Sequence, residues 1–229
     1  MVETLCHELA KLAVEDCMSK ASFGDVLVCS DRDMEIPGTT WVPVENWPSK
    51  LGWSEYLWYG VPQHVKTKQA LLIQWDSGIC QPEKWRDEFM QYDHIGAPWW
   101  WHPTGMDIGN SGFSLRSKRL MNFLIQHRDA FPVSDPEDVA LSQAYRADLE
   151  KAGFKWPDYD TADRFAFECN APSVTQGHFG YHAMRNWPMV FDKQELLKRA
   201  RLAASNRYIR ETSMFQDLLR ASPRLQSQL

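Results

Sequence analysis

The alternation of helical and strand patterns along the chain predicts an α/β fold. Residues 3–20 place apolar side chains at roughly helical spacing, and a short β-branched run follows at 25–29, behind Gly24. Two further apolar runs, at 70–76 and 165–168, have the character of strands and are separated by helical segments. Because strand and helix patterns alternate in this way, we expect an α/β sandwich.

The segments between these runs complete the predicted order of elements. Prolines interrupt the chain after Asp31 and leave an edge strand at 40–44, and the aromatic-rich residues 54–60 are predicted to be helical. Pro82 suits the first turn of a short helix that covers 85–92. The rest is predicted as an extended segment at 95–103, a glycine-rich loop at 105–112, a strand leading into a helix at 113–127, and helices at 135–151, 192–204 and 211–221.

Composition narrows the class of protein. A chain of 229 residues with 44% hydrophobic content can bury one sizeable core. Its formal net charge of -5 supplies no overall basic field, so nucleic acid is not an expected partner. The five cysteines contain no C-x-x-C pair, which is typical of a reducing compartment. No apolar run approaches about 18 residues and the amino terminus lacks a signal-peptide pattern, so we expect a cytoplasmic protein.

A carboxylate stands where the apolar run at 70–76 ends. Residues at i and i+2 of a strand share a face, so Gln74 and Asp76 are predicted to point the same way. A carboxylate and an amide oxygen there are ligands that suit a hard divalent ion holding phosphate oxygens. A turn cap is an equally good interpretation of Asp76 alone.

A loop with two glycines and small polar side chains begins at Gly109. Its residues Asn110, Ser111 and Gly112 let the backbone approach a ligand closely. The spacing does not match the glycine and lysine pattern of a nucleotide-binding fingerprint. An ordinary glycine turn explains the loop equally well.

Two adjacent carboxylates, Glu137 and Asp138, open a predicted helix behind Pro136. Acidic residues stabilise a helix amino terminus, which is a sufficient structural reason for both. A carboxylate in a cleft also serves as a general base for a substrate hydroxyl. The sequence therefore leaves a capping role and a catalytic role open.

Two further segments carry candidate side chains. His178 and His182 are four apart, but glycines at 177 and 180 argue against a helix, so one metal ligand is expected rather than two. The aromatic run that begins at Trp99 suits either a core or a platform on which a sugar stacks.

These motifs, taken in order, resemble those of a known family over roughly residues 55–185. The matching blocks are Gln74-Trp75-Asp76, Trp85 to Trp99, Gly109 to Ser117, Pro136-Glu137-Asp138-Val139 and Phe179-Gly180-Tyr181-His182. They resemble the uncharacterised-domain family DUF5672, which is regarded as glycosyltransferase-like, and their order is similar to that in GT-A glycosyltransferases. The resemblance implies a GT-A-like domain over residues 1–190, with a mixed, mostly parallel sheet flanked by helices, and a helical extension over 191–229.

The resemblance also implies roles for individual residues. Asp76 and His182 correspond to metal ligands, with Gln74 at the first position of the Asp-x-Asp motif, and Asp138 or Glu137 corresponds to the catalytic base. The implied cofactor is Mn²⁺ or Mg²⁺, and the implied partners are a nucleotide-sugar donor and a carbohydrate or glycoconjugate acceptor. The implied substrate-binding residues are Gln74, Trp75, Asn110, Ser111, Gly112, Trp99, Thr4 and Asp31.

The chain departs from the GT-A pattern in two places. Gln74 stands where an aspartate is expected, which removes one negative charge from the metal site. The first strand of such a domain, whose end helps to hold the nucleotide, would close at residues 2–4, so we expect either a short strand or a start further upstream.

The resemblance favours a metal-assisted, inverting glycosyltransferase. A sugar-binding or nucleotide-sugar-binding module without turnover and a metal-dependent hydrolase remain alternatives from other classes. The carboxy-terminal segment is basic in an otherwise acidic protein, which suits an anionic glycan, a membrane surface or a partner subunit, although a solvated helix face is the simpler interpretation. Its basic residues include Lys198, Arg199, Arg201, Arg207, Arg210, Arg220 and Arg224.

Overall fold

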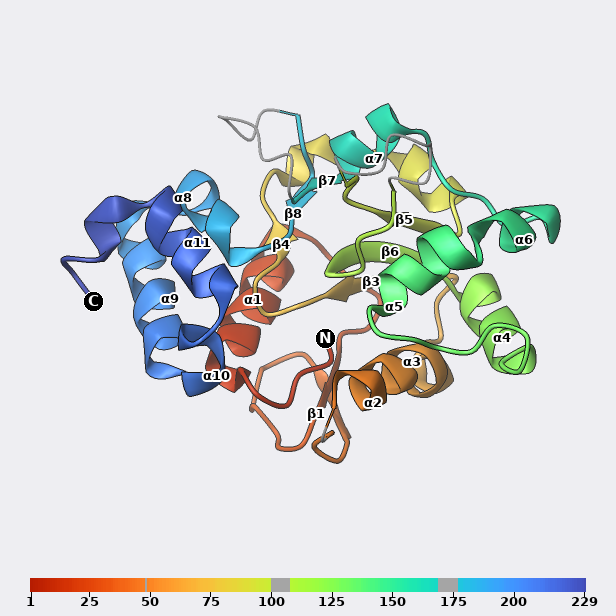
Figure 1. Cartoon of the computed structure of the whole chain (residues 1–229), viewed down its shortest axis with the longest axis horizontal. Helices are drawn as coiled ribbons and strands as arrows, with labels where there is room; N and C mark the ends of the chain where they lie inside the picture. Colours follow the sequence, from red (N-terminus) through yellow and green to blue (C-terminus); the bar gives the residue numbers. More distant parts are fainter. Residues whose placement is uncertain (48, 100–107, 169–176) are drawn as a thin grey trace.

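The computed structural model describes residues 1–47, 49–99, 108–168 and 177–229, and it confirms the α/β class. Small sheets lie at the centre, and helices surround them (Figure 1). None of the helices in these ranges is long and apolar enough to cross a membrane.

The amino-terminal part forms a helix and a small parallel sheet. Helix α1 (His7–Lys20) is followed by β1 (Leu27–Ser30) and β2 (Thr40–Pro43), close to the predicted ranges. Strand β1 pairs in parallel with β2, and on its other side Val2 forms a parallel bridge with Cys29. The chain therefore enters the fold as a short strand beside β1.

Two further sheets position the polar residues of interest. The first has the order β3 (Gln69–Ile73), β6 (Phe113–Ser117), β5 (His94–Gly96), and the second has the order β4 (Gly78–Ile79), β8 (Gly180–Tyr181), β7 (Ala166–Phe167). A turn over residues 74–77 connects β3 to β4, so the two sheets are adjacent.

The prediction of a mostly parallel sheet is wrong for the described strands. Strand β6 is antiparallel to both of its neighbours, and β4 is antiparallel to β8. In the described chain this leaves β1 with β2, β7 with β8 and the single bridge between Val2 and Cys29 as parallel pairs. A parallel pair needs a crossover connection that returns the chain to the same end of the sheet. Here β5 and β6 follow one another in the chain and pair antiparallel, so the connection between them is not such a crossover. Strand β6 is followed directly by α4 (Lys118–Gln126).

Helices cover the sheets on several sides. The segment predicted as helical at 54–60 extends further, as α2 (Lys50–Glu55), a π-helical segment at Tyr56–Gly60 and α3 (Val61–His64). The short helix predicted at 85–92 is a 3-10 helix at Asp87–Gln91, preceded by another at Pro82–Lys84. The helix predicted at 135–151 is α5 (Glu137–Val139), a π-helical segment at Ala140–Ala144 and α6 (Arg146–Lys151), and α7 (Tyr159–Phe165) follows it.

The carboxy-terminal helices gather beyond α1, on the side away from α4 and α6 (Figure 1). They share an apolar cluster with α1 and the segment after β8, in which Leu9, Tyr181 and Trp187 meet Ala200 and Leu218. The elements are a 3-10 helix at Met184–Asn186, α8 (Trp187–Val190), α9 (Lys193–Ser205), α10 (Arg207–Arg210), α11 (Ser213–Ala221) and a 3-10 helix at Pro223–Leu225. The division of the chain into a domain over residues 1–190 and a helical extension over 191–229 stays a prediction.

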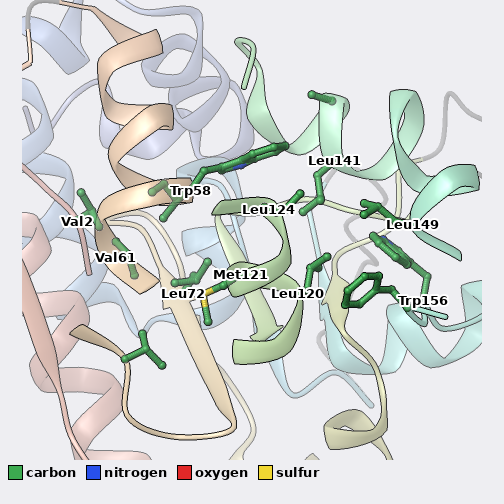
Figure 2. Packing of buried hydrophobic residues seen from close by; sticks show 14 of the residues in the cluster. Val2, Trp58, Val61, Leu72, Leu120, Met121, Leu124, Leu141, Leu149 and Trp156 are labelled. Carbon is green, nitrogen blue, oxygen red and sulfur yellow. The ribbon is translucent and has the colours of Figure 1, made fainter. Parts of the chain in front are cut away.

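The largest apolar cluster joins the N-terminal segment, α3, β3 and α4. Figure 2 shows Trp58 and Leu72 close to Met121 and Leu124 of α4. Trp58 has no exposed surface, so its indole N–H needs a partner inside the protein. That partner is the carboxylate of Glu137, one of the candidate site residues.

Candidate functional site

Three predicted residues, Gln74, Asp76 and His182, meet in one cluster. In the sheet of β4, β8 and β7, Gly78 lies opposite Tyr181 in antiparallel register. The turn that precedes β4 therefore lies beside the residue that follows β8. Asp76 sits in that turn rather than in β3, which ends at Ile73, so the shared strand face that we expected is not what brings the residues together.

The imidazole of His182 faces oxygen atoms on both sides. Its Nε2 lies 3.2 Å from Oε1 of Gln74 and 3.5 Å from Oδ1 of Asp76, and its Nδ1 lies 3.1 Å from Oε1 of Glu168. Both ring nitrogens therefore need a hydrogen, or Nε2 needs a bound cation. Burial disfavours the imidazolium, but the Asp76 and Glu168 carboxylates outweigh burial and raise the pKa of His182 to about 10.

Asp76 is the most constrained member of the cluster. The residue is 2% exposed, and its Oδ1 accepts no hydrogen bond within the described chain. A buried carboxylate oxygen without a donor is costly unless a positive charge lies beside it. Here that charge is the His182 ring, or a cation that both residues bind.

Glu168 is a member of the cluster that we did not predict from the sequence. This carboxylate follows β7 directly, accepts a hydrogen bond of 3.0 Å from Nδ2 of Asn110 and contacts Nδ1 of His182 through its other oxygen. The same signal that drew attention to Asp76, an acidic residue where an apolar run stops, was present in Phe165-Ala166-Phe167-Glu168. It could have identified Glu168.

The loop before β6 closes the cluster from the other side. Oδ1 of Asn110 accepts from the Gly112 N–H at 2.8 Å, and the Gly112 carbonyl accepts from the Gln74 N–H at 2.9 Å. A Cβ on Gly112 would lie 2.1 Å from Nε2 of His182. We expected the backbone of this loop to approach a ligand closely. In the structure, Gly112 lets the backbone approach the His182 ring closely.

The two carboxylates that open α5 have different surroundings. Glu137 is 3% exposed, and its Oε2 accepts from Nε1 of Trp58 and lies 3.4 Å from Nη2 of Arg116. Arg116, itself fully buried, also donates to Oγ of Ser111 at 2.8 Å. Glu137 therefore ties the loop, β6 and Trp58 together inside the protein.

Asp138 is half-buried and contacts the loop before β6. It accepts from the N–H of Val139 at 2.9 Å and from the N–H of Ser111 at 3.4 Å, so it satisfies one N–H of the first helical turn and also fixes the loop. Burial, together with repulsion from Glu137, raises the pKa of Asp138 to about 6. Such a carboxylate is poised to accept a proton near neutral pH.

The other predicted residues lie at the edge of the cluster or away from it. Trp75 packs edge-on against Trp187, with ring centroids 6.1 Å apart. Trp99 is buried beside Gly109, while residues 100–103 of the aromatic run lie outside the described ranges. The sugar-stacking role of Trp99 stays a prediction.

Thr4 and Asp31 follow the strands at Val2 and β1. Thr4 donates to Oδ1 of Asn46 at 3.1 Å, and Asp31 lies 2.6 Å from Nε2 of His7. Neither makes a hydrogen bond or ion pair with the cluster around His182 in the described part of the chain. His178 is also separate, since its Nε2 lies 3.4 Å from Oδ2 of Asp163.

The donor set of the cluster fits a divalent ion. Within the described ranges no group of three His, Cys, Asp or Glu side chains is arranged to hold a metal. Gln74 supplies a third donor of another type, so that Gln74 Oε1, Asp76 Oδ1 and His182 Nε2 converge. Carboxylate, amide and imidazole donors suit Mn²⁺, and Glu168 behind Nδ1 is a carboxylate that would orient a metal-binding histidine.

The fold and the cluster define an α/β protein with a largely buried histidine between two carboxylates, held by the turn after β3, the loop before β6 and the ends of β7 and β8. Residues 40–182 match the family described as "Protein of unknown function (DUF5672)". The match covers more than half of the chain, and the chain belongs to this family. No curated protein matches it.

Proposed function

We propose that the protein is a glycosyltransferase that moves a sugar from a nucleotide-sugar donor to a hydroxyl acceptor. The observation that carries the proposal is the convergence of Gln74, Asp76 and His182 next to a loop that also contacts Asp138. The group of Gln74, Asp76 and His182 suits a diphosphate with its cation, and Asp138 supplies a base. The order of the motifs, which is similar to that in GT-A glycosyltransferases, supports the same function.

The first half would hold the donor. Gln74, Asp76 and His182 would bind Mn²⁺ or Mg²⁺, which supplies positive charge to a departing nucleoside diphosphate. Glu168 keeps the His182 ring in place through Nδ1 and links it to Asn110. The neutral side chain of Gln74 makes this site less negative than one with two aspartates, so we expect metal affinity to increase when the diphosphate is bound.

The second half would activate the acceptor. Asp138 takes the proton from the acceptor hydroxyl as the new bond to the anomeric carbon forms and the bond to the nucleoside diphosphate breaks. Its pKa of about 6 leaves it ionised at neutral pH and still basic enough to act. A single base that assists attack from the face opposite the leaving group inverts the anomeric configuration.

The test is a donor panel. The protein is incubated with UDP-, GDP-, CMP- and dTDP-sugars and Mn²⁺, and release of free nucleotide is measured with and without candidate acceptors. We expect release with at least one donor, and its loss in Asp76→Ala and in Asp138→Asn. Asp129→Asn, in the segment between α4 and α5, serves as a matched control that keeps activity. Absence of release with every donor would count against the transferase.

A second candidate, a module that binds a nucleotide-sugar without turnover, is favoured by one observation. Gln74 replaces an acidic ligand, so the described cluster contains a single carboxylate facing Nε2 of His182. Calorimetry with the same donors separates the two functions. A module binds donor but releases no nucleotide even as the native chain, whereas the transferase releases nucleotide as the native chain and, in the Asp138→Asn variant, loses turnover while it retains donor binding.

A further inference from the structure

The free edge of β3 is unusual because the strand is apolar. Its sheet has the order β3, β6, β5, so among the described strands β3 has a neighbour on one side only. The Gln74 N–H donates to Gly112 and the Lys118 N–H to Lys68, which fixes the alternation of the antiparallel ladder. The N–H and C=O groups of Leu71 and Ile73 therefore point away from β6.

Strand β1 presents a second edge across from the first. On the β2 side, Val26 and Ser30 accept hydrogen bonds from Thr40 and Val44. The other side is covered by Met1–Glu3 only in part: the Cys29 N–H donates to Met1, while no described hydrogen bond uses the N–H of Leu27. The two-stranded sheet thus also presents a backbone N–H, that of Leu27, which has no neighbouring strand in the described chain.

A groove of about 490 Å³ lies between these two edges. Met1, Val2 and Leu27 line it on one side, and β3 lines it along its whole length on the other. Residues Ala70, Leu71 and Ile73 are half-exposed here, although apolar edge strands of this kind are normally covered or carry charges. The groove ends beside Gln74 and Ser111, at the margin of the candidate site.

The chemistry of the walls indicates what would fill the groove. An acyl chain or another apolar small molecule would leave the N–H of Leu27 and the backbone groups of Leu71 and Ile73 buried without partners, which costs free energy. An extended peptide satisfies them through its own backbone, and its alternate side chains cover the apolar surface. Lys66 and Lys68 line the end of the groove away from the site, where Asp25 also lies. Of the three lysines in the lining, Lys20, Lys66 and Lys68, only Lys20 has an ion pair within the described chain, with Asp16 at 2.9 Å.

We propose that this groove binds an extended apolar segment of a partner polypeptide as an added β-strand, which joins the sheet of β1 and β2 to that of β3, β6 and β5. The bound segment alternates apolar residues and carries an acidic residue near Lys66 and Lys68. This inference does not rest on the proposed transferase activity, because none of the residues that carry it binds the donor or the metal.

The test starts from a phage library of random linear peptides of about twelve residues, selected against the full chain. We expect enriched sequences to alternate β-branched or aromatic residues and to carry Asp or Glu near one end. Synthetic copies are then titrated by fluorescence polarisation. On peptide binding, hydrogen exchange of the Leu71 and Ile73 amides should slow, since these N–H groups become bonded.

Matched variants locate the peptide. Leu71→Pro removes an outward N–H that no β6 bond uses, and proline is tolerated on edge strands, so peptide affinity should fall about tenfold. Leu71→Ala keeps the N–H and should stay within about threefold of the native affinity. The exposed pair Lys66→Glu and Lys68→Glu tests the acidic end without touching β3, and circular dichroism checks that each variant is folded.

Three results would overturn the proposal. The first is a selection without strand-like peptides, or peptides that bind Leu71→Pro and the lysine variants undiminished. The second is a concentration-dependent dimer in sedimentation that Leu71→Pro abolishes, which would assign the edge to a second copy of the chain. The third is a fluorescent fatty acid that competes with the peptide and binds Leu71→Pro unchanged, which would make the groove a site for apolar small molecules.

Discussion

Oε1 of Glu168 lies 3.1 Å from Nδ1 of His182, while the other oxygen of the same carboxylate accepts from Asn110. One side chain thus fixes the orientation of the imidazole and connects it to the loop before β6. Residues from β7, β8 and the loop meet through this carboxylate, although they are far apart in the sequence.

The first prediction concerns Glu168. The Glu168→Gln variant keeps the size of the side chain but removes the charge behind Nδ1, so the His182 ring is less well oriented and less basic. Substitutions of such outer carboxylates weaken metal sites by about 10- to 100-fold. We expect that loss in Mn²⁺ affinity, measured by calorimetry. Glu55→Gln, an exposed site on α2, is the control, and equal affinity in both variants would contradict the role of Glu168.

The second prediction uses Gly112. A Cβ there would overlap Nε2 of His182, so Gly112→Ala must displace the ring or the loop. We expect Mn²⁺ binding and nucleotide release to be lost together. At Gly24 an added Cβ would meet its nearest neighbour at 3.7 Å, an ordinary contact, so Gly24→Ala should retain both. Retention of both properties by Gly112→Ala would show that the ring need not lie where the structure places it.

The third prediction concerns Asp138 and pH. Its folded pKa of about 6 lies above the ordinary value of 3.8, so the folded chain holds a proton that the unfolded chain has released. The stability contribution of this group is therefore fully present below about pH 4 and is lost as the pH rises to about 6. Asp138→Asn should be more stable than the native protein at pH 8, by about 1 to 3 kcal/mol, with no gain at pH 4.

Urea denaturation at the two pH values measures this difference. If the native chain turns over a donor, its activity should rise through about pH 6 as Asp138 ionises. A gain in stability that is equal at pH 4 and pH 8 would mean that the asparagine acts through packing and not through the removed charge.

The fourth prediction concerns the buried pair of Arg116 and Glu137. Glu137→Gln leaves the Arg116 guanidinium buried without its counter-charge, which should lower the free energy of unfolding by about 3 to 5 kcal/mol. Combining it with Arg116→Met should cost less than the sum of the two single changes, because no unpaired charge remains. Denaturant titrations of the four proteins in this double-mutant cycle measure the coupling, and strictly additive losses would show that the pair is not coupled.

Much of the fold followed from local patterns. The helix of residues 3–20, the strand at 25–29, and the strand leading into a helix at 113–127 were predicted from periodicity and are present as α1, β1 and β6 with α4. The mostly parallel arrangement was wrong because strand direction depends on how each connection packs, and periodicity carries no information about that. Local patterns also predicted a short helix at 85–92, but they did not show that it is a 3-10 helix, at Asp87–Gln91.

For the candidate site, local patterns in the sequence identified Gln74 and Asp76 at the end of an apolar run, Asn110 in a glycine-rich loop, Asp138 at a helix start and His182 between glycines. Only the tertiary structure decided which of them share a cluster. Strand pairing sets Gly78 opposite Tyr181 and so joins the turn of Asp76 to His182, while Thr4 and Asp31 make their contacts elsewhere. The contact of Gln74 with His182 joins residues 108 positions apart and depends on the packing of whole elements. The sequence marks Glu168 as an acidic residue at the end of an apolar run, but only the folded chain shows that it contacts both His182 and Asn110.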